Sequence, residues 1–268
     1  MASASITLVA GYPRSGTTFT AGSCAASEAW WHQGEGILEL RDKARPRTGF
    51  QLDAGLDRVQ FDRSVATLRR FSVRTHSPPA VVRDQFPEVW ERVARILYVQ
   101  RHPFEVALSV CRYVIATQGF IPGTGTPETS FEAAAERGDV AAFFRRFCTH
   151  RGAPNFLEAW GSWSDHLASW HEAMAESGLP NAVLSYDRLV REPVPRLLAV
   201  AEALGLPWQE DHIRKAVTQM APEKVRAGIG AFFVGKDPEA LRYPDLLGDD
   251  DIRLGFATFG PEMLRFGL

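Results

Sequence analysis

The stretch GYPRSGTT, residues 11–18, decides the fold. An apolar run before it, SITLVAG at 5–11, predicts a buried strand, and small residues after it at 17–29 predict a helix. Its two glycines have the G-x-x-x-x-G spacing of a phosphate-binding loop, whose backbone N–H groups close around an anion at a helix N-terminus. Thr17 stands where nucleotide kinases carry a lysine, which argues against ATP phosphoryl transfer. We therefore predict an anion-binding loop that serves another reaction.

The rest of the chain alternates between strand and helix patterns. Apolar runs predict further strands at 71–75, 94–100 and 182–186. Helix patterns occupy 104–117, 155–177, 194–204 and 209–220. This alternation predicts an α/β, P-loop-like fold with a central, mostly parallel sheet flanked by helices on both faces. We expect residues 1–268 to form a single domain.

Two stretches lack a regular pattern. Residues 119–130 are rich in Gly, Pro and Thr, which predicts a long loop, and loops of this kind are often mobile or functional. The chain beyond Gly228 predicts irregular structure with an acidic cluster at 249–251.

The composition is that of an ordinary globular protein. The chain has 268 residues, 45% of them hydrophobic and 23% charged, with a formal net charge of −2. This balance gives no basic field for nucleic acid, and no run of 18 apolar residues predicts a membrane span. We expect a cytoplasmic protein without nucleic-acid or membrane partners. Cys24, Cys111 and Cys148 lack metal-ligand spacing, so no metal is expected.

The loop carries a family resemblance. Residues 12–19, YPRSGTTF, resemble the YPKSGTTW loop of sulfotransferases, which holds the 5′-phosphosulfate of 3′-phosphoadenosine 5′-phosphosulfate (PAPS). The resemblance implies that PAPS is the co-substrate and that these residues bind it: Arg14, Ser15, Gly16, Thr17 and Thr18. It also implies that Arg14 contacts the bridging oxygen between phosphate and sulfonate.

The loop departs from the family pattern at two positions. Arg14 replaces the usual lysine and Phe19 the usual tryptophan. Protein-tyrosine sulfotransferases use PRSGTT, so an arginine is compatible with activity. A guanidinium stays charged and can stabilise the leaving phosphate electrostatically, but it does not hand over a proton.

Three further segments resemble parts of the donor site. The segment YVQRHP at 98–103, continuing to Ser109, resembles the element in which an Arg and a Ser bind the 3′-phosphate, here Arg101 and Ser109. Tyr186 begins a segment that resembles the Y-E-D-L element, whose tyrosine lies near the adenine. VRAGIG at 225–230 resembles R-x-G-x-x-G with one residue missing, which makes Arg226 a second candidate for the 3′-phosphate.

Two residues compete for the role of the base that takes the proton of the acceptor hydroxyl. His76 lies in VRTHSP, which resembles the K-T-H-x-P element after a strand, and an ordinary imidazole has a pKa near neutrality. Glu35 lies in QGEG, which resembles the Gly-Glu element of protein-tyrosine sulfotransferases, but burial would have to raise its pKa. We favour His76 and keep Glu35 as the alternative.

The resemblance implies an enzyme that transfers a sulfonate group from PAPS to a hydroxyl of a small molecule and releases 3′-phosphoadenosine 5′-phosphate (PAP). Residues 163–170 agree, because they resemble the W-x-x-H-x-x-x-W helix of small-molecule sulfotransferases. A phenolic or hydroxylated natural product is the expected acceptor, and a homodimer stays open. The alternatives are a P-loop kinase or phosphotransferase and a non-catalytic nucleotide-binding protein.

Overall fold

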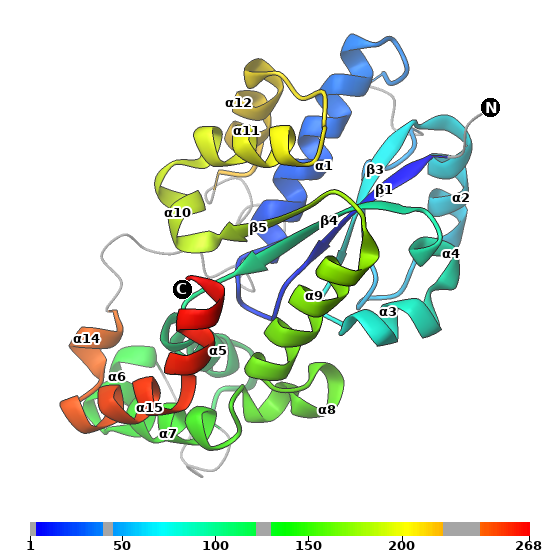
Figure 1. The fold of residues 1–268 in the computed structure, drawn as a ribbon. Coiled ribbons are helices and arrows are strands. Elements are labelled where there is room, and N and C mark those ends of the chain that lie inside the picture. The colour runs from blue at the N-terminus through cyan, green and yellow to red at the C-terminus, as the bar shows by residue number, and fades with distance from the viewer. Residues whose placement is uncertain (1–3, 40–44, 122–129, 222–241) are drawn as a thin grey trace. The chain divides into compact units, whose positions relative to one another are not determined.

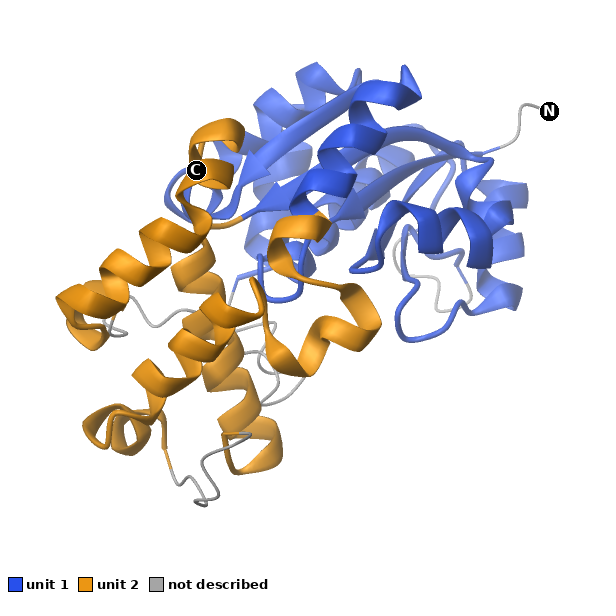
Figure 2. Ribbon diagram, turned by 60° about the horizontal axis from the view of Figure 1, so that its bottom comes forward, with its two compact units in different colours: residues 1–100, 167–221 blue, residues 101–166, 222–268 orange. Residues whose placement is uncertain are grey.

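The computed structural model describes residues 4–39, 45–121, 130–221 and 242–268 (Figure 1). The chain forms two compact units. Residues 1–100 and 167–221 make the first, and residues 101–166 and 222–268 make the second (Figure 2). That the whole chain acts as a single domain stays a prediction.

The first unit is built on a sheet of five parallel strands in the order β2-β3-β1-β4-β5. The strands are β1 (Ser5–Ala10), β2 (Gly49–Gln51), β3 (Arg70–Thr75), β4 (Val93–Gln100) and β5 (Asn181–Ser185). Ala10 at the end of β1 pairs with Thr75 at the end of β3. The residues that follow these two strands therefore lie side by side. The parallel sheet confirms the predicted α/β fold class.

Helices cover both faces of this sheet (Figure 1). They are α1 (Thr17–Gly34), α2 (Arg58–Thr67), α3 (Pro79–Gln85), α4 (Pro87–Trp90), α10 (Tyr186–Arg191), α11 (Pro193–Ala203), α12 (Glu210–Gln219) and the part of α9 (Trp163–Ser177) from Leu167 on. On one face, Val9 and Leu97 of the sheet join a core with Cys24 of α1 and Leu197 of α11. On the other, Trp170 of α9 donates its indole N–H to the Ser77 carbonyl at 3.2 Å.

The second unit is helical. It contains α5 (Pro103–Gln118), α6 (Phe131–Glu136), α7 (Asp139–Thr149), η1 (Pro154–Phe156), α8 (Leu157–Trp160), the first turn of α9, α14 (Tyr243–Leu246) and α15 (Asp249–Phe266). Aromatic side chains pack its interior, with Phe104 against Phe144 at a ring distance of 5.0 Å. Gly255 of α15 allows this packing, because a Cβ there would lie 2.3 Å from the Phe104 ring.

Two predictions about the elements were wrong. The single helix expected at 155–177 is interrupted, because Gly161 has a φ of +74° and separates α8 from α9. The tail expected to be irregular forms α15, whose first turn carries Asp249, Asp250 and Asp251. Acidic side chains there complement the positive end of the helix dipole. Pro261 inside the helix hides the pattern in the sequence.

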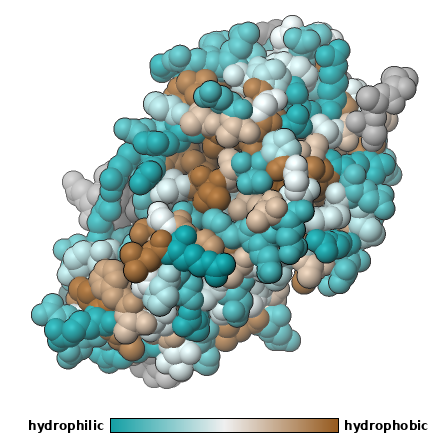
Figure 3. Space-filling view, viewed as in Figure 1, coloured by the Kyte–Doolittle hydropathy of each residue, from teal (hydrophilic) through white to brown (hydrophobic). Residues whose placement is uncertain are grey.

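Within the part of the chain that the structure describes, no helix is both long and apolar enough to cross a membrane. On the face that Figure 3 shows, hydrophobic residues lie in separate groups among hydrophilic ones. The same described ranges contain no group of three or more His, Cys, Asp or Glu side chains that could hold a metal ion. Of the predicted loop at 119–130, residues 122–129 lie outside the described residues.

Candidate active site

The phosphate loop connects β1 to α1. Gly16 is the N-cap of α1 with a φ of +94°, a left-handed conformation that glycine adopts without strain. Arg14 also has a positive φ, of 69°, which costs an L-residue about 1 kcal/mol. Gly11 has a different reason to be glycine, because a Cβ there would lie 2.6 Å from the Val99 carbonyl oxygen. The backbone of the loop thus requires glycine at both positions, and Ser15 and Thr17 are buried at the start of α1.

Tyr186, the first residue of α10, packs against this loop. A Cβ on Gly16 would lie 1.9 Å from the Tyr186 ring, so the aromatic ring rests directly on the loop backbone. The sequence placed both residues in the donor site for separate reasons. The structure brings them into contact, although whether Tyr186 lies near an adenine stays a prediction.

His76 follows β3 and reaches the loop through both ring nitrogens. Its Nδ1–H donates to the Gly11 carbonyl at 2.8 Å, and Nε2 lies 3.5 Å from the Thr17 hydroxyl oxygen. The register of β1 and β3 explains this contact, since Ala10 and Thr75 are partners and Gly11 and His76 come next. With the proton on Nδ1, the neutral ring carries its lone pair on Nε2, which faces the first residue of α1.

Burial and nearby charges set the pKa of His76. Burial lowers its pKa below the usual value, and the cations Arg74 and Arg14 lower it further. Asp53 and the hydrogen bond to Gly11 act in the opposite direction. The pKa is therefore lower than the near-neutral value that the sequence suggested.

Two residues near the loop were missed by the sequence reasoning. Arg74 of β3 hydrogen-bonds the Thr18 hydroxyl through its Nη1. Burial lowers the pKa of Arg74, but a guanidinium remains charged at neutral pH. Asp53, just after β2, accepts the backbone N–H of His76 at 3.0 Å. Arg74 occupies the lysine position of the K-T-H-x-P element, which was a usable signal, whereas Asp53 lies in no motif.

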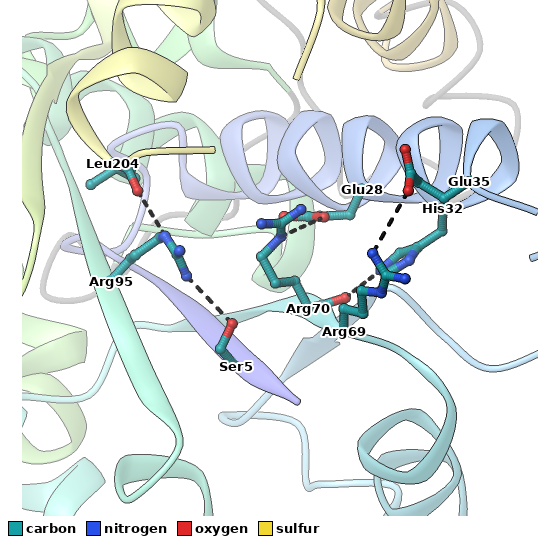
Figure 4. Close-up of polar contacts among 8 residues, drawn as sticks. All are labelled: Ser5, Glu28, His32, Glu35, Arg69, Arg70, Arg95 and Leu204. Atoms are coloured by element: carbon teal, nitrogen blue, oxygen red, sulfur yellow. Dashed lines mark hydrogen bonds and ion pairs between the residues drawn. The ribbon is translucent and has the colours of Figure 1, made fainter. Parts of the chain in front are cut away.

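The alternative base, Glu35, does not lie at the loop. It caps the far end of α1, which has 18 residues, so the helical rise separates it from Thr17 by about 27 Å. There it forms an ion pair with Arg69 at 3.7 Å, with both side chains largely exposed (Figure 4). The structure thus corrects the expectation that Glu35 could take the proton, because its carboxylate belongs to the opposite end of the sheet.

The predicted 3′-phosphate residues begin the second unit. Arg101 directly follows β4, is 5% exposed, and pairs through Nη2 with Glu105 of α5 at 3.3 Å. Ser109 lies two turns into the same helix and is half-buried. Arg226 lies outside the described residues. The roles of Arg101, Ser109 and Arg226 stay predictions.

Known proteins resemble this chain in sequence and in fold. The model of the sulfotransferase domain family matches residues 5–228. Sulfotransferase 1C2 of Oryctolagus cuniculus is 25% identical over 154 residues, which are 58% of this chain and 44% of that protein. The protein of the same name from Rattus norvegicus is 24% identical over the same shares. The match therefore spans less than half the length of these curated relatives.

Solved structures show the same fold. Mouse sulfotransferase SULT7A1, complexed with PAP, has a TM-score of 0.60 and 16% identity, over 98% of this chain and 85% of its own. Retinol dehydratase, in a complex with retinol and PAP, has a TM-score of 0.60 and 14% identity, over 96% of this chain and 81% of its own. With the family model matching most of the sequence, these findings identify the chain as a member of the sulfotransferase domain family.

Proposed function

We propose that this chain transfers a sulfonate group from PAPS to a hydroxyl of a small molecule. The contact between His76 and Gly11 carries the proposal, because it fixes the imidazole beside the phosphate loop with Nε2 toward Thr17. Membership in the family and the PAP complexes of the fold relatives support PAPS as the donor.

The residues at the loop fit an anionic donor. The first turn of α1 contains no acidic residue, so its backbone N–H groups and the helix dipole favour negative charge. Arg14 on the loop and Arg74 bonded to Thr18 add two cations. When bound, PAPS supplies the sulfonate and a phosphate leaving group.

The same residues suggest how the reaction is assisted. His76 takes the proton of the acceptor hydroxyl on Nε2 while Nδ1 stays bonded to Gly11. Arg14 and Arg74 stabilise the negative charge that grows on the leaving phosphate, and they require no proton transfer to do so. We extend the proposal to residues 1–268 as one cytoplasmic domain, with a phenolic or hydroxylated natural product as acceptor.

The donor proposal is tested by thermal melts with PAP and with ATP and Mg²⁺ in separate samples. PAP at a hundred times its Kd should stabilise the folded protein by about 2.7 kcal/mol through mass action, and the melting temperature should rise accordingly. ATP should not raise it. Labelled PAPS with a panel of phenols and alcohols should then yield sulfonated product. Stabilisation by ATP alone would indicate a kinase, and PAP binding without product from any acceptor would indicate a non-catalytic binder.

Two glycine variants at opposite ends of α1 make the melt specific to the loop. Gly16→Ala places a methyl group on the Tyr186 ring, so the stabilisation by PAP should be lost. Gly36→Ala imposes a similar backbone strain, with a φ of +69°, but its Cβ would meet nothing within 4 Å. It should lower the melting temperature without PAP and leave the increase produced by PAP intact.

A further inference from the structure

Asp53 accepts hydrogen bonds from all three residues of the turn at 75–77, which contains His76. Both of its carboxylate oxygens accept the backbone N–H of His76, each at 3.0 Å. Its Oδ1 also accepts the hydroxyls of Thr75 and Ser77, each at 3.2 Å. One carboxylate therefore contacts the catalytic candidate and both of its chain neighbours. The Ser77 N–H donates to the Thr75 hydroxyl oxygen at 2.9 Å and closes the turn on itself.

The position of Asp53 follows from the sheet. Gln51, the last residue of β2, pairs with Arg74 of β3, so the chain that leaves β2 runs beside the chain that leaves β3. On the other side of β3, the pairing of Ala10 with Thr75 brings Gly11 to the His76 ring. His76 is thus held at two points: Asp53 fixes its backbone and Gly11 fixes its imidazole.

We infer that Asp53 is a positioning residue for His76. Asp53 fixes the turn so that Nε2 of His76 faces Thr17, and its negative charge stabilises the protonated form of the imidazole. This inference rests on the proposed function, in which His76 is the base. Asp53 touches no reacting atom in this scheme and acts through His76 alone.

The charges around His76 show why a carboxylate is useful there. Arg74 comes from β3 and Arg14 from the phosphate loop, and both oppose protonation of the ring, while the facing residue of α1, Thr17, is neutral. Asp53 is the anion that acts against these two cations, because its negative charge raises the pKa of His76. Without it, the two cations and burial act unopposed except for the Gly11 hydrogen bond. The imidazole would then be a weaker base.

The first test is Asp53→Asn, which keeps the size of the side chain and removes its charge. We expect kcat to fall about 10- to 100-fold, which is the range found when a residue that orients a metal-binding histidine through a hydrogen bond is replaced. The pKa of His76 should fall, so the acidic limb of the kcat/KM profile should move to lower pH. The affinity for PAP should change less than twofold, because Asp53 does not belong to the phosphate loop.

Asp57→Asn is the matched control. Asp57 caps α2 by accepting the Gln60 N–H at 3.1 Å, four residues away from Asp53 in sequence. Asparagine caps helices about as well as aspartate, so this variant should keep the melting temperature close to that of the wild type and leave kcat and the pH profile unchanged. Asp53→Glu is the second variant: it keeps the charge and alters the geometry, so kcat should fall while the titration of His76 stays closer to that of the wild type.

Two measurements do not depend on turnover. An NMR titration of the His76 ring should give a lower pKa in Asp53→Asn than in the wild type. In the wild-type protein, hydrogen exchange should show a protected His76 amide, which decides the contact even if neither variant folds. If the wild type forms no sulfonated product, the proposed function fails, while these readouts still decide whether Asp53 holds and tunes His76. Wild-type turnover with an unaltered kcat and His76 titration in Asp53→Asn, or an unprotected amide, would overturn the inference.

Discussion

The two ends of α1 carry buried polar networks with opposite organisation. At its beginning, His76 contacts the Thr17 hydroxyl, Arg74 hydrogen-bonds the Thr18 hydroxyl, and the charge of Arg14 acts on His76. At its other end, Glu28 is fully buried beside Arg70, with Nε to Oε2 at 3.6 Å (Figure 4). There each charge meets a partner of the opposite sign or an aromatic ring.

The comparison separates a site from a structural network. Arg70 lies 4.0 Å from the centre of the Trp31 ring, and His32 donates to the Arg70 carbonyl at 2.8 Å. These contacts join α1 to the start of β3 and leave the cationic side chain enclosed by its own neighbours. At the loop, the charges that act on the buried His76 are those of Asp53, Arg74 and Arg14, and cations beside a phosphate-binding loop suit an anionic ligand.

The largest expected effect comes from removing the histidine at the loop. His76→Ala should lower kcat by about 10² to 10⁴, the usual contribution of a general base, with little change in PAP affinity. In the wild type, the acidic limb of kcat/KM should lie below pH about 6.5, because burial lowers the pKa of His76. Steady-state kinetics over a range of pH would measure both effects.

His32→Ala is the matched control for this prediction. His32 is also buried, and it also donates to a backbone carbonyl, but it lies at the opposite end of α1. It should lower the melting temperature and keep kcat. A loss of kcat in this variant as large as in His76→Ala would mean that both effects reflect stability.

A second prediction concerns the network at the far end. Burial raises the pKa of Glu28 from 4.5 to about 7, against the opposing effect of Arg70. A raised carboxyl pKa gives stability that is fully present below the unfolded value and is lost as pH rises through the folded value. Wild-type stability should therefore fall between pH about 4.5 and 7 relative to Glu28→Gln, by about 3 kcal/mol at most. Urea unfolding of both proteins at several pH values would measure the difference, and parallel curves would contradict it.

A third prediction concerns the charge of Arg14 on the phosphate loop. Arg14→Ala should lower kcat about a hundredfold, because the positive charge of Arg14 stabilises the negative charge that develops on the leaving phosphate. Donor affinity should change less, since the interaction strengthens in the transition state. Arg14→Lys keeps the charge and should retain more activity. An unchanged kcat in Arg14→Ala, with weaker donor binding, would make Arg14 an anchor.

The sequence predicted those parts of the site that lie in continuous patterns. The apolar run before residue 11 and the glycines of the loop predicted both β1 and the start of α1, and the confirmed fold follows from these local signals. His76 was singled out because it follows a strand within a short motif, and the structure places it in contact with the loop, while its role as the base stays a prediction. In each case the chemistry and the element that positions it lie within a few residues of each other.

The parts that were missed depend on pairing between distant segments. Asp53 reaches His76 only because β2, which has 3 residues, joins the sheet beside β3. So short a strand has no detectable periodicity. Glu35 was misplaced for a related reason: the helix predicted at 17–29 continues to Gly34, and the added turns carry the carboxylate to the other end of the sheet.

The smallest expected effect tests that correction directly. Glu35→Gln removes an ion pair with Arg69 in which the side chains are 47% and 65% exposed. Solvent and salt screen such a pair, so the free energy of unfolding should change by no more than about 1 kcal/mol. Because Glu35 lies the length of α1 from the loop, kcat, KM and the pH profile should match those of the wild type. Arg69→Gln should give the same small loss of stability, since it breaks the same pair. A large loss of kcat in Glu35→Gln, with His76→Ala still active, would make Glu35 the base that takes the proton of the acceptor hydroxyl. It would also mean that α1 lies differently from its place in this structure.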